Sequence, residues 1–325
     1  MNIGDYLKLN KIDKIAVCSR SFSKNESLRC MLLEKYEHVK FNDQGLSLSG
    51  DSLVDFLAGY DGAIVALEFI DDSILSQLPE LKYIGKYGVG LDKIDLDAMD
   101  QHGVKLGWTP GVNAQNVAEY TITMILNLLK NIPKSMQVAL DGYWHQIKGY
   151  QLSSMTVGIL GCGHVGKALV KILKSFGCNI LVSDIEDVSD FCRKNEVHQV
   201  PLSRLVSESD ILSVHVPKNS TTDNILNQDI LLKMKKGSYV INSARGGLID
   251  EEAVLKLLDS GHLAGAAFDV LEEEPPSDLE FIKHPKTLVT THIAGSSYEA
   301  INAMGRAAIN GLIHKEVASS FSKFK

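Results

Sequence analysis

Three glycines constrain the fold of this chain more than any other feature of its sequence. Gly161, Gly163 and Gly166 follow a short apolar run at residues 155–160 and precede a helix-like segment at residues 168–176. The spacing G-x-G-x-x-G permits a tight turn, a close approach of the backbone to a pyrophosphate, and close packing of the helix on the strand. A helix beginning there offers unpaired N–H groups and the positive end of its dipole to phosphate. The segment therefore predicts a dinucleotide-binding strand, loop and helix.

An acidic residue follows the next apolar run and narrows the choice of cofactor. Residues 178–183 predict a second strand, and Asp184 comes directly after it. A carboxylate at this place accepts hydrogen bonds from the hydroxyls of the adenosine ribose and repels the extra phosphate of NADP. The next residues, Ile185 and Glu186, supply no arginine for such a phosphate. We therefore predict NAD as the cofactor; the alternative is a structural glycine turn followed by a solvated aspartate.

Short apolar runs alternate with helix-like segments along most of the chain. The runs are residues 14–18, 62–66, 81–85, 104–108, 155–160, 178–183, 211–216, 238–242, 264–268 and 287–291. Runs of this kind are typical of strands buried on both faces, so the alternation predicts doubly wound α/β architecture with parallel sheets. The length of 325 residues predicts two domains. Residues 116–131 have helical periodicity, end before Pro133, and predict a long helix that links the domains.

The overall charge and the cysteines exclude several classes of function. The net charge is −7 without a long basic run, which disfavours nucleic acid and anionic membranes as partners. The first fourteen residues lack the apolar core of a signal peptide, and no stretch of about 18 apolar residues predicts a transmembrane helix. The five cysteines form no C-x-x-C pair, which disfavours a disulfide framework or a cysteine zinc site. We expect a cytoplasmic protein without a bound metal.

Three polar segments follow predicted strands of the second half of the chain, at residues 242–247, 269–276 and 291–296. Ligands bind at the carboxyl ends of parallel strands, so these segments predict an active site. Arg245 can hold a carboxylate and polarise a carbonyl oxygen. His292 can act as the general acid, with Glu274 behind it to orient the ring and favour its protonated form. Each residue alone could be a surface ion pair or a solvated turn; their joint placement favours reduction of a 2-keto acid.

At these residues the chain resembles the D-isomer-specific 2-hydroxyacid dehydrogenase family, from about Gly62 to Gly305. The motifs that carry the resemblance are residues 86–95, 109–113, 117–119, the glycine loop, 215–217, 234–237, 242–250, and the segments around Glu274 and His292. The first dozen residues have no counterpart in this pattern and are interpreted as an extension.

The resemblance implies a role for each matching position. It implies Arg245, Glu274 and His292 as the catalytic residues. Backbone N–H groups of Gly88, Val89 and Gly90 would bind the substrate carboxylate, with Asn113 near the pocket. The remaining cofactor contacts would come from His164, Val165, Val216, Pro217, Thr222, Ser243, Ala244, Asp269 and Gly295, with Arg245 and His292 also beside the cofactor.

The resemblance also implies the order of the domains and an assembly. A Rossmann NAD-binding domain, residues 113–296, would be inserted into a flavodoxin-like substrate domain, residues 1–112 and 297–325. The active site would lie in the cleft between them, and closure of the cleft would exclude water. Members of the family are usually homodimers, joined through helices that flank the cofactor domain. The extra C-terminal regulatory domain of many phosphoglycerate-using members is not expected here.

One departure from the family pattern bears on the substrate. Phosphoglycerate-using relatives carry an arginine just after the strand that here is residues 62–66, whereas this chain continues Leu67-Glu68-Phe69. The missing cation favours unphosphorylated acids such as glyoxylate, hydroxypyruvate or an aliphatic 2-keto acid. Glu68 could favour a substrate with an amine or hydroxyl, or simply face solvent.

Two alternatives to this function stay open at the level of sequence. A protein of the same fold could use NAD(H) occupancy as a signal without significant turnover. An enzyme of the same fold could instead act on formate or phosphite. Formate enzymes of this fold pair a glutamine with the histidine, and Glu274 at that position argues against formate.

Overall fold

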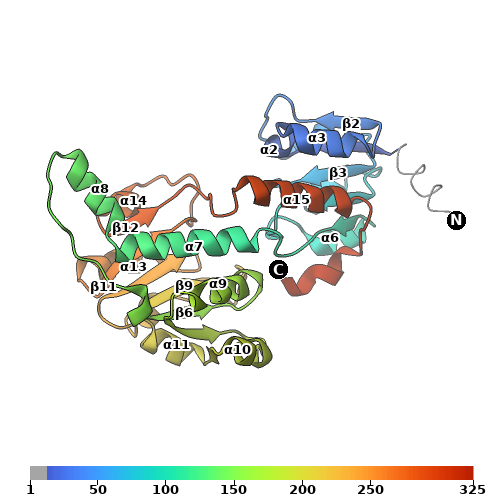
Figure 1. Cartoon of the computed structure of the whole chain (residues 1–325). Coiled ribbons are helices and arrows are strands. Elements are labelled where there is room, and N and C mark those ends of the chain that lie inside the picture. The colour runs from blue at the N-terminus through green and yellow to red at the C-terminus, as the bar shows by residue number, and fades with distance from the viewer. Residues whose placement is uncertain (1–12, 325) are drawn as a thin grey trace. The chain divides into compact units, whose positions relative to one another are not determined.

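The computed structural model describes residues 13–324, so the expected N-terminal extension lies outside the described residues. The chain divides into two compact units. Unit 1 is Met1–Asn113 with Tyr298–Lys325, and unit 2 is Ala114–Ser297. Each unit is built on its own parallel sheet (Figure 1). The predicted architecture, two doubly wound α/β units with parallel sheets, is confirmed.

Unit 1 contains a five-stranded sheet in the order β2-β1-β3-β4-β5. Its strands are β1 (Lys14–Val17), β2 (His38–Phe41), β3 (Gly62–Val65), β4 (Tyr83–Lys86) and β5 (Lys105–Gly107). Its helices are α2 (Arg20–Ser23), α3 (Glu26–Leu33), α4 (Asp51–Leu57), α5 (Asp72–Leu75), α6 (Leu96–Gln101), α15 (Tyr298–Gly311) and the 3₁₀ segment η2 (Ala318–Phe324). This strand order is the flavodoxin-like one, as predicted.

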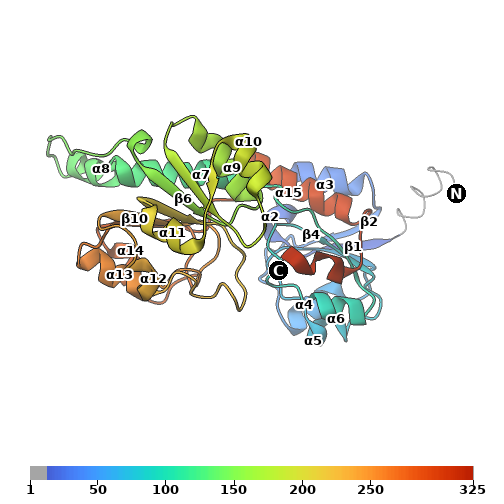
Figure 2. The ribbon, with the colours of Figure 1, turned by 90° about the horizontal axis from the view of Figure 1, so that it is seen from below.

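Both faces of the unit 1 sheet are covered, because alternate residues of each central strand enter opposite cores. Ile15 and Ile64 pack with α3 and α15, whereas Ala16 and Ala63 pack with α4, α5 and α6. Figure 2 shows these helices on opposite sides of the strands. Strands buried in this way contain few polar residues, which is why they were visible as apolar runs.

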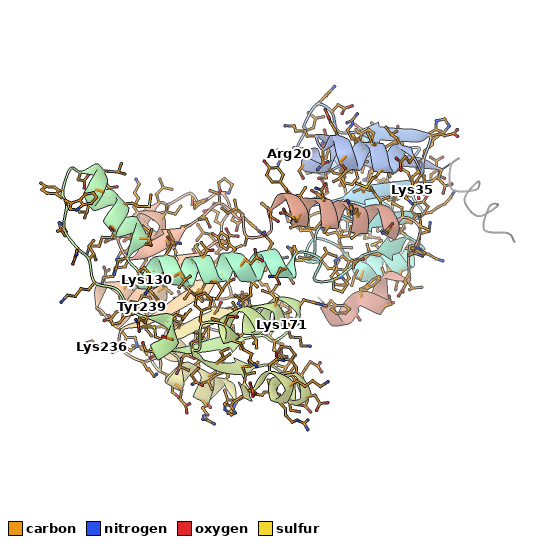
Figure 3. All side chains as sticks on the ribbon, in the orientation of Figure 1. Arg20, Lys35, Lys130, Lys171, Lys236 and Tyr239 are labelled. Atoms are coloured by element: carbon orange, nitrogen blue, oxygen red, sulfur yellow. The ribbon has the colours of Figure 1, made fainter. Side chains whose placement is uncertain are left out.

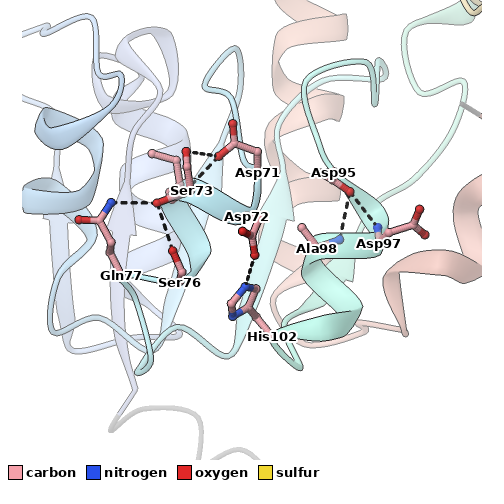
Figure 4. Close-up of polar contacts among 10 residues, drawn as sticks. Asp71, Asp72, Ser73, Ser76, Gln77, Asp95, Asp97, Ala98 and His102 are labelled. Atoms are coloured by element: carbon pink, nitrogen blue, oxygen red, sulfur yellow. Dashed lines mark hydrogen bonds and ion pairs between the residues drawn. The ribbon is translucent and has the colours of Figure 1, made fainter.

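Two helices on one face of the unit 1 sheet, α5 and α6, begin at acidic caps (Figure 4). Asp71 accepts a hydrogen bond from the first turn of α5, and Asp95 does the same for α6. Asp72 pairs with His102 at 2.8 Å. These carboxylates satisfy N–H groups that a helix start leaves unpaired.

Unit 2 contains a seven-stranded parallel sheet in the order β12-β11-β10-β9-β6-β7-β8. Its strands are β6 (Thr156–Leu160), β7 (Asn179–Ser183), β8 (His198–Gln199), β9 (Ile211–Val214), β10 (Ser238–Asn242), β11 (Leu263–Phe268) and β12 (Thr287–Val289). The chain direction across the sheet reverses between β6 and β9, and ligands bind at such a switch point.

Helices cover both faces of this sheet as well (Figure 2). One core includes residues of α7 (Ala114–Leu129), α9 (His164–Lys174) and α10 (Ser189–Asn195). The opposite core includes residues of α11 (Leu202–Glu208), α12 (Gln228–Leu231), α13 (Glu251–Asp259) and α14 (Glu280–Lys283). The remaining elements are α8 (Ile132–Leu140) and the 3₁₀ turn η1 (Leu152–Ser154).

Helix α7 lies directly on the sheet of unit 2. A Cβ built on Gly265 of β11 would lie 3.2 Å from Tyr239 of β10 and 3.3 Å from Leu128 of α7. Tyr239 is labelled below α7 in Figure 3. The absence of a side chain at Gly265 therefore lets the helix pack close to the strands.

Three expectations from the sequence differ from the structure. The apolar runs did not include β2 or β8, which are edge strands with polar or half-buried positions. Pro133 does not simply end the linking helix: α7 ends at Leu129, and Pro133 lies in the first turn of α8. Proline is well suited to that place because the first N–H groups of a helix have no partner within it.

Candidate active site

The glycine loop of unit 2 has the conformation that its spacing predicts. Gly161 has φ +96°, and a Cβ there would lie 2.6 Å from the carbonyl oxygen of His215. A Cβ on Gly166 would lie 2.2 Å from the carbonyl oxygen of Gly161, whereas a Cβ on Gly163 would meet nothing within 4 Å. The first and third glycines are therefore required by close packing, and the second leaves open space beside the loop.

Helix α9 begins within the glycine motif, directly after Gly163, so His164 and Val165 are its first residues. Its N-cap, Gly163, provides no side-chain acceptor. The N–H groups of the first turn of a helix have no partner within the helix, so here they are available to an external anion. Open space at Gly163 and free donors at the start of α9 fit the pyrophosphate of a dinucleotide.

Asp184 follows β7 and lies beside the glycine loop. Its carboxylate accepts hydrogen bonds from the N–H of Cys162 at 2.5 Å and from that of Glu186 at 2.9 Å. Each carboxylate oxygen has a further lone pair for a ribose hydroxyl. Arg193, the next arginine along the chain, pairs with Asp190. The local charge therefore fits NAD and opposes the phosphate of NADP.

Ile185 is a candidate cofactor contact that the sequence reasoning missed. Its side chain is fully exposed although it is apolar, and it lies next to Asp184. An exposed branched side chain at this place can cover one face of the adenine. The available signal was an isoleucine directly after the acid that ends the second strand.

The segment after β9 forms the next wall of the glycine loop. A Cβ on Gly161 would lie 2.9 Å from the side chain of Val216. Thr222 Oγ1 donates a hydrogen bond to the carbonyl oxygen of Pro217 at 2.7 Å and accepts one from the N–H of Asn219 at 2.9 Å. These bonds close residues 217–222 into a turn at the place expected for the adenine and ribose contacts.

His215 should give the stability of the fold a characteristic pH dependence. Its ring nitrogen Nε2 lies 2.8 Å from Ser213 Oγ, and burial lowers the pKa of His215 from 6.5 to about 4. Between these values the unfolded chain binds a proton that the folded chain does not. Stability should therefore fall as the pH falls from 6.5 to about 4, by up to about 1.4 kcal/mol per pH unit.

A substitution tests this prediction. His215→Gln can keep a bond to Ser213 but cannot titrate, so the free energy of unfolding should vary less over this pH range. Urea unfolding at a series of pH values measures it, and an equal pH slope in the two proteins would contradict the assignment.

Arg245 extends from a loop that its own neighbours hold in place. Asn242 Nδ2 donates to the carbonyl oxygen of Arg245 at 2.8 Å, and Asn242 Oδ1 accepts from the N–H of Ala244 at 3.1 Å. The guanidinium also donates to the carbonyl oxygen of Ala244 at 2.7 Å. Gly246 packs against the next loop, because a Cβ there would lie 1.9 Å from the carbonyl oxygen of Leu271.

Asp269 is buried at the end of β11 and organises the loop that carries His292. Its carboxylate accepts hydrogen bonds from Thr290 Oγ1 at 2.6 Å and from the N–H groups of Ile293 and Ala294 at 2.8 Å. Its carbonyl oxygen accepts from the N–H of His292 at 2.9 Å. The expected contact of Asp269 and the adjacent Gly295 with the nicotinamide stays a prediction.

His292 and Glu274 form a hydrogen-bonded pair. His292 Nδ1 lies 2.8 Å from Glu274 Oε2, and Glu274 Oε1 accepts from the N–H of Leu271 at 3.0 Å. The backbone of His292 has φ +56°, a conformation that residues other than glycine seldom adopt. Such strained positions cluster at functional sites. The second ring nitrogen, Nε2, has no partner among residues 13–324 and is available to a substrate.

The structure thus brings the Arg245, Glu274 and His292 loops together at the carboxyl ends of β10, β11 and β12. The N–H of Asp269 donates to the carbonyl oxygen of Asn242, which links the first loop to the second. The predicted substrate-binding residues Gly88, Val89, Gly90 and Asn113 belong to unit 1.

The loop after β4 in unit 1 has a buried cation beneath it. Lys86 is 5% exposed, and its Nζ donates to the carbonyl oxygen of Ala66 at 2.5 Å. Gly88 has φ +121°, and a Cβ there would lie 3.4 Å from Lys86 Nζ. Lys86 therefore lies beneath the loop whose N–H groups are predicted to bind the substrate carboxylate, and sequence reasoning missed it.

Glu68 turns back onto its own loop. Its carboxylate accepts a hydrogen bond from the N–H of Ala66 at 2.6 Å. The pKa of the Cys18 thiol is raised mainly by its own burial and, second, by the negative charge of Glu68. One oxygen of the Glu68 carboxylate is therefore engaged by the backbone of its own loop, and a role of Glu68 towards a substrate stays a prediction. The neighbouring Leu67 and Phe69 are 68% and 59% exposed.

Among residues 13–324, no helix is long and apolar enough to cross a membrane, and no group of histidine, cysteine and acidic side chains is arranged to hold a metal ion. The cysteines at positions 18, 30, 162, 178 and 192 are unpaired.

Comparison with known proteins matches this architecture. Residues 122–294 match the family model described as D-isomer specific 2-hydroxyacid dehydrogenase, NAD binding domain. A structure from Polaromonas sp. JS6 66, assigned to the same family, has a TM-score of 0.85 and 27% identity, over 93% of this chain and 95% of that one.

Two enzymes match the sequence more closely. The chain is 37% identical over 254 residues to the glyoxylate reductase of Thermofilum pendens, over 75% of this chain and 74% of that enzyme. It is 34% identical over 249 residues to the D-3-phosphoglycerate dehydrogenase of Bacillus subtilis, over 76% of this chain and 47% of that protein. The match therefore spans about half the length of this second relative.

Proposed function

This chain belongs to the D-isomer-specific 2-hydroxyacid dehydrogenase family, and we propose that it transfers a hydride between NAD(H) and C2 of a small D-2-hydroxy or 2-keto acid. The observation that carries the proposal is the His292–Glu274 pair, 2.8 Å apart, beside the loop of Arg245 and in the same unit as the glycine loop. NADH supplies the hydride when it is bound.

The roles of the three side chains follow from their chemistry. The Arg245 guanidinium binds the keto acid through its carboxylate and polarises the carbonyl group. His292 Nε2 delivers a proton to the carbonyl oxygen as C2 accepts the hydride, so that the product is a neutral hydroxyl group. Glu274 holds Nδ1, which fixes the orientation of the imidazole ring. Oxidation of the hydroxy acid runs the same steps in reverse.

We assign substrate binding to the domain of residues 1–112 and 297–325 and cofactor binding to the domain of residues 113–296. These bounds differ by one residue from those of unit 1 and unit 2. The N–H groups of Gly88, Val89 and Gly90 would bind the carboxylate. Asn113 would lie near the pocket.

We propose an unphosphorylated substrate. The loop after β3 presents Leu67 and Phe69, both exposed, and the carboxylate of Glu68 is engaged by the backbone of Ala66. Apolar side chains favour a small or aliphatic substituent on C3, and residues 66–69 themselves give a phosphate no cation; Lys93 Nζ lies 4.8 Å from the centroid of the Phe69 ring. The name of the glyoxylate reductase relative fits this substrate class.

A panel assay tests both activity and substrate. NADH oxidation would be followed with glyoxylate, hydroxypyruvate, an aliphatic 2-keto acid and phosphohydroxypyruvate. We expect turnover with an unphosphorylated acid and the lowest kcat/KM with the phosphorylated one. If NADH binds but no keto acid is reduced, the protein is an NAD(H) sensor and the dehydrogenase hypothesis fails. Activity on formate or phosphite would instead support the second alternative, an enzyme of the same fold with a different substrate.

Asp184→Ala should raise the KM for NAD by about 10–100-fold and reduce the preference for NAD over NADP. The variant loses charge-assisted hydrogen bonds to the ribose and removes the repulsion of the extra phosphate. Steady-state kinetics with each cofactor measure it, and Asp190→Ala is the matched control because that exposed acid pairs only with Arg193. A wild type that already prefers NADP would contradict the cofactor assignment.

We also propose a cytoplasmic homodimer. Helix α8 has no buried residue, and Ile132, Met136 and Leu140 recur at helical spacing along it, all exposed. Trp144, shortly after the helix, is 94% exposed. An apolar surface of this kind is typical of an interface. Sedimentation at micromolar concentration tests the proposal, and a monomer there would overturn it.

A further inference from the structure

One face of helix α7 contacts two of the three loops that carry the proposed catalytic residues, those of His292 and Arg245. Asn116 Nδ2 donates to the carbonyl oxygen of Ala294 at 2.6 Å, one turn before Tyr120, whose hydroxyl bonds to Thr290 Oγ1. Thr121 Oγ1 lies 2.8 Å from Ser243 Oγ. Residues four apart in a helix share a face, so Asn116 and Tyr120 reach the His292 loop together.

The direction of the hydrogen bonds from Tyr120 is fixed by the groups that receive them. The Asp269 carboxylate only accepts, so Thr290 donates its hydroxyl proton to Oδ1. The Thr290 oxygen must then accept from Tyr120. Burial raises the pKa of Tyr120 to about 12, which keeps its hydroxyl protonated as the donor. Tyr120, Thr290 and Asp269 therefore form one directed chain.

The end of this chain is the backbone next to His292. The Asp269 carboxylate that accepts from Thr290 also accepts the N–H groups of Ile293 and Ala294. His292 itself, at φ +56°, needs such support because this backbone conformation is unfavourable for it. A loss of the Tyr120 hydroxyl would leave the Thr290 oxygen without its donor and loosen the loop at the position of the proton donor.

We propose that Tyr120 is a positioning residue for the reaction, which holds His292 in its working orientation through Thr290 and Asp269. The inference rests on the proposed function, in which His292 Nε2 delivers the proton. Asn116 supports the same loop through Ala294, and Thr121 supports the Arg245 loop through Ser243.

The first experiment compares two substitutions of tyrosine by phenylalanine in the whole chain. Tyr120→Phe should lower kcat by about 3–10-fold, the range of one lost hydrogen bond, with KM for NADH changed less than twofold. Tyr239→Phe is the matched control, because Tyr239 lies under α7 and its hydroxyl has no hydrogen-bond partner among the described residues. Equal kcat values in the two variants would overturn the proposal.

A double-mutant comparison tests the route through Thr290. Thr290→Val breaks the chain at its centre, so Tyr120→Phe should have no further effect on kcat in that background. Additive losses of kcat would show that Tyr120 acts elsewhere and would overturn the proposal.

Hydrogen–deuterium exchange separates this inference from the proposed function. In Tyr120→Phe the amides of Ile293 and Ala294 should exchange about 3–10-fold faster, whereas in Tyr239→Phe they should exchange at the wild-type rate. This readout needs no turnover. If exchange is faster in the variant but the protein reduces no keto acid, Tyr120 does support the His292 loop and the proposed dehydrogenase function is wrong. Unchanged exchange would refute the positioning role itself.

Discussion

Replacing His292 with alanine should lower kcat by roughly 10²–10⁴-fold and leave the Kd of NADH nearly unchanged. The imidazole is the group whose free Nε2 can deliver a proton, and its partner Glu274 lies 2.8 Å away on the other ring nitrogen. The cofactor would still be held by the glycine loop and Asp184. Steady-state kinetics and a fluorescence titration with NADH measure the two quantities.

Two further variants serve as controls for the His292→Ala experiment. Because His292 has φ +56°, His292→Asn is included, since asparagine tolerates this conformation better than alanine. His102→Ala is the matched control, as His102 also pairs with a carboxylate at 2.8 Å, that of Asp72 in unit 1. A kcat unchanged in both His292 variants, or lowered equally in the control, would refute the proton-donor role.

Replacing Arg245 with alanine should lower kcat/KM for the keto acid by about 10²–10³-fold, with NADH binding retained. The loss corresponds to charge-assisted hydrogen bonds to a carboxylate, each worth about 1.5–3 kcal/mol. Arg245→Lys should recover only part of the activity, because an ammonium lacks the planar pair of donors.

The control for Arg245 is Arg204→Ala, which removes an exposed arginine that pairs with Glu208 on α11. The loop conformation is held mainly by Asn242, which bonds to the backbone of residues 244 and 245, so the variant should fold. Full activity of Arg245→Lys would mean that charge alone suffices and that no bidentate contact forms. Loss of NADH binding in Arg245→Ala would mean that its role lies with the cofactor.

The central strands and the glycine loop could be predicted from sequence because their signals are local. Ile159 and Val182 face one core of unit 2, whereas the adjacent Leu160 and Leu181 face the opposite core, so such strands form apolar runs. Two edge strands differ: β2 and β8 keep polar residues on their exposed sides and have no such run, whereas the edge strands β5 and β12 do have one. Pro133 was interpreted as a helix end, although proline is equally suited to the first turn of the next helix.

The sequence by itself determined which residue types follow each strand, and therefore the candidates Arg245, Glu274, His292 and Asp184. It also determined the turn at Gly161, since a packed loop at φ +96° excludes a side chain. These conclusions depend on residues close together along the chain.

Only the tertiary structure decided what supports those candidates. Tyr120 and Thr290 are 170 residues apart in sequence, and Asn116 and Ala294 are 178 apart, so no local pattern could reveal their hydrogen bonds. The same holds for Lys86, which lies 20 residues from the carbonyl group it contacts. Hydrogen-bond partners are set by the distance between atoms in the folded chain, and that distance is fixed only when the helices pack on the sheets.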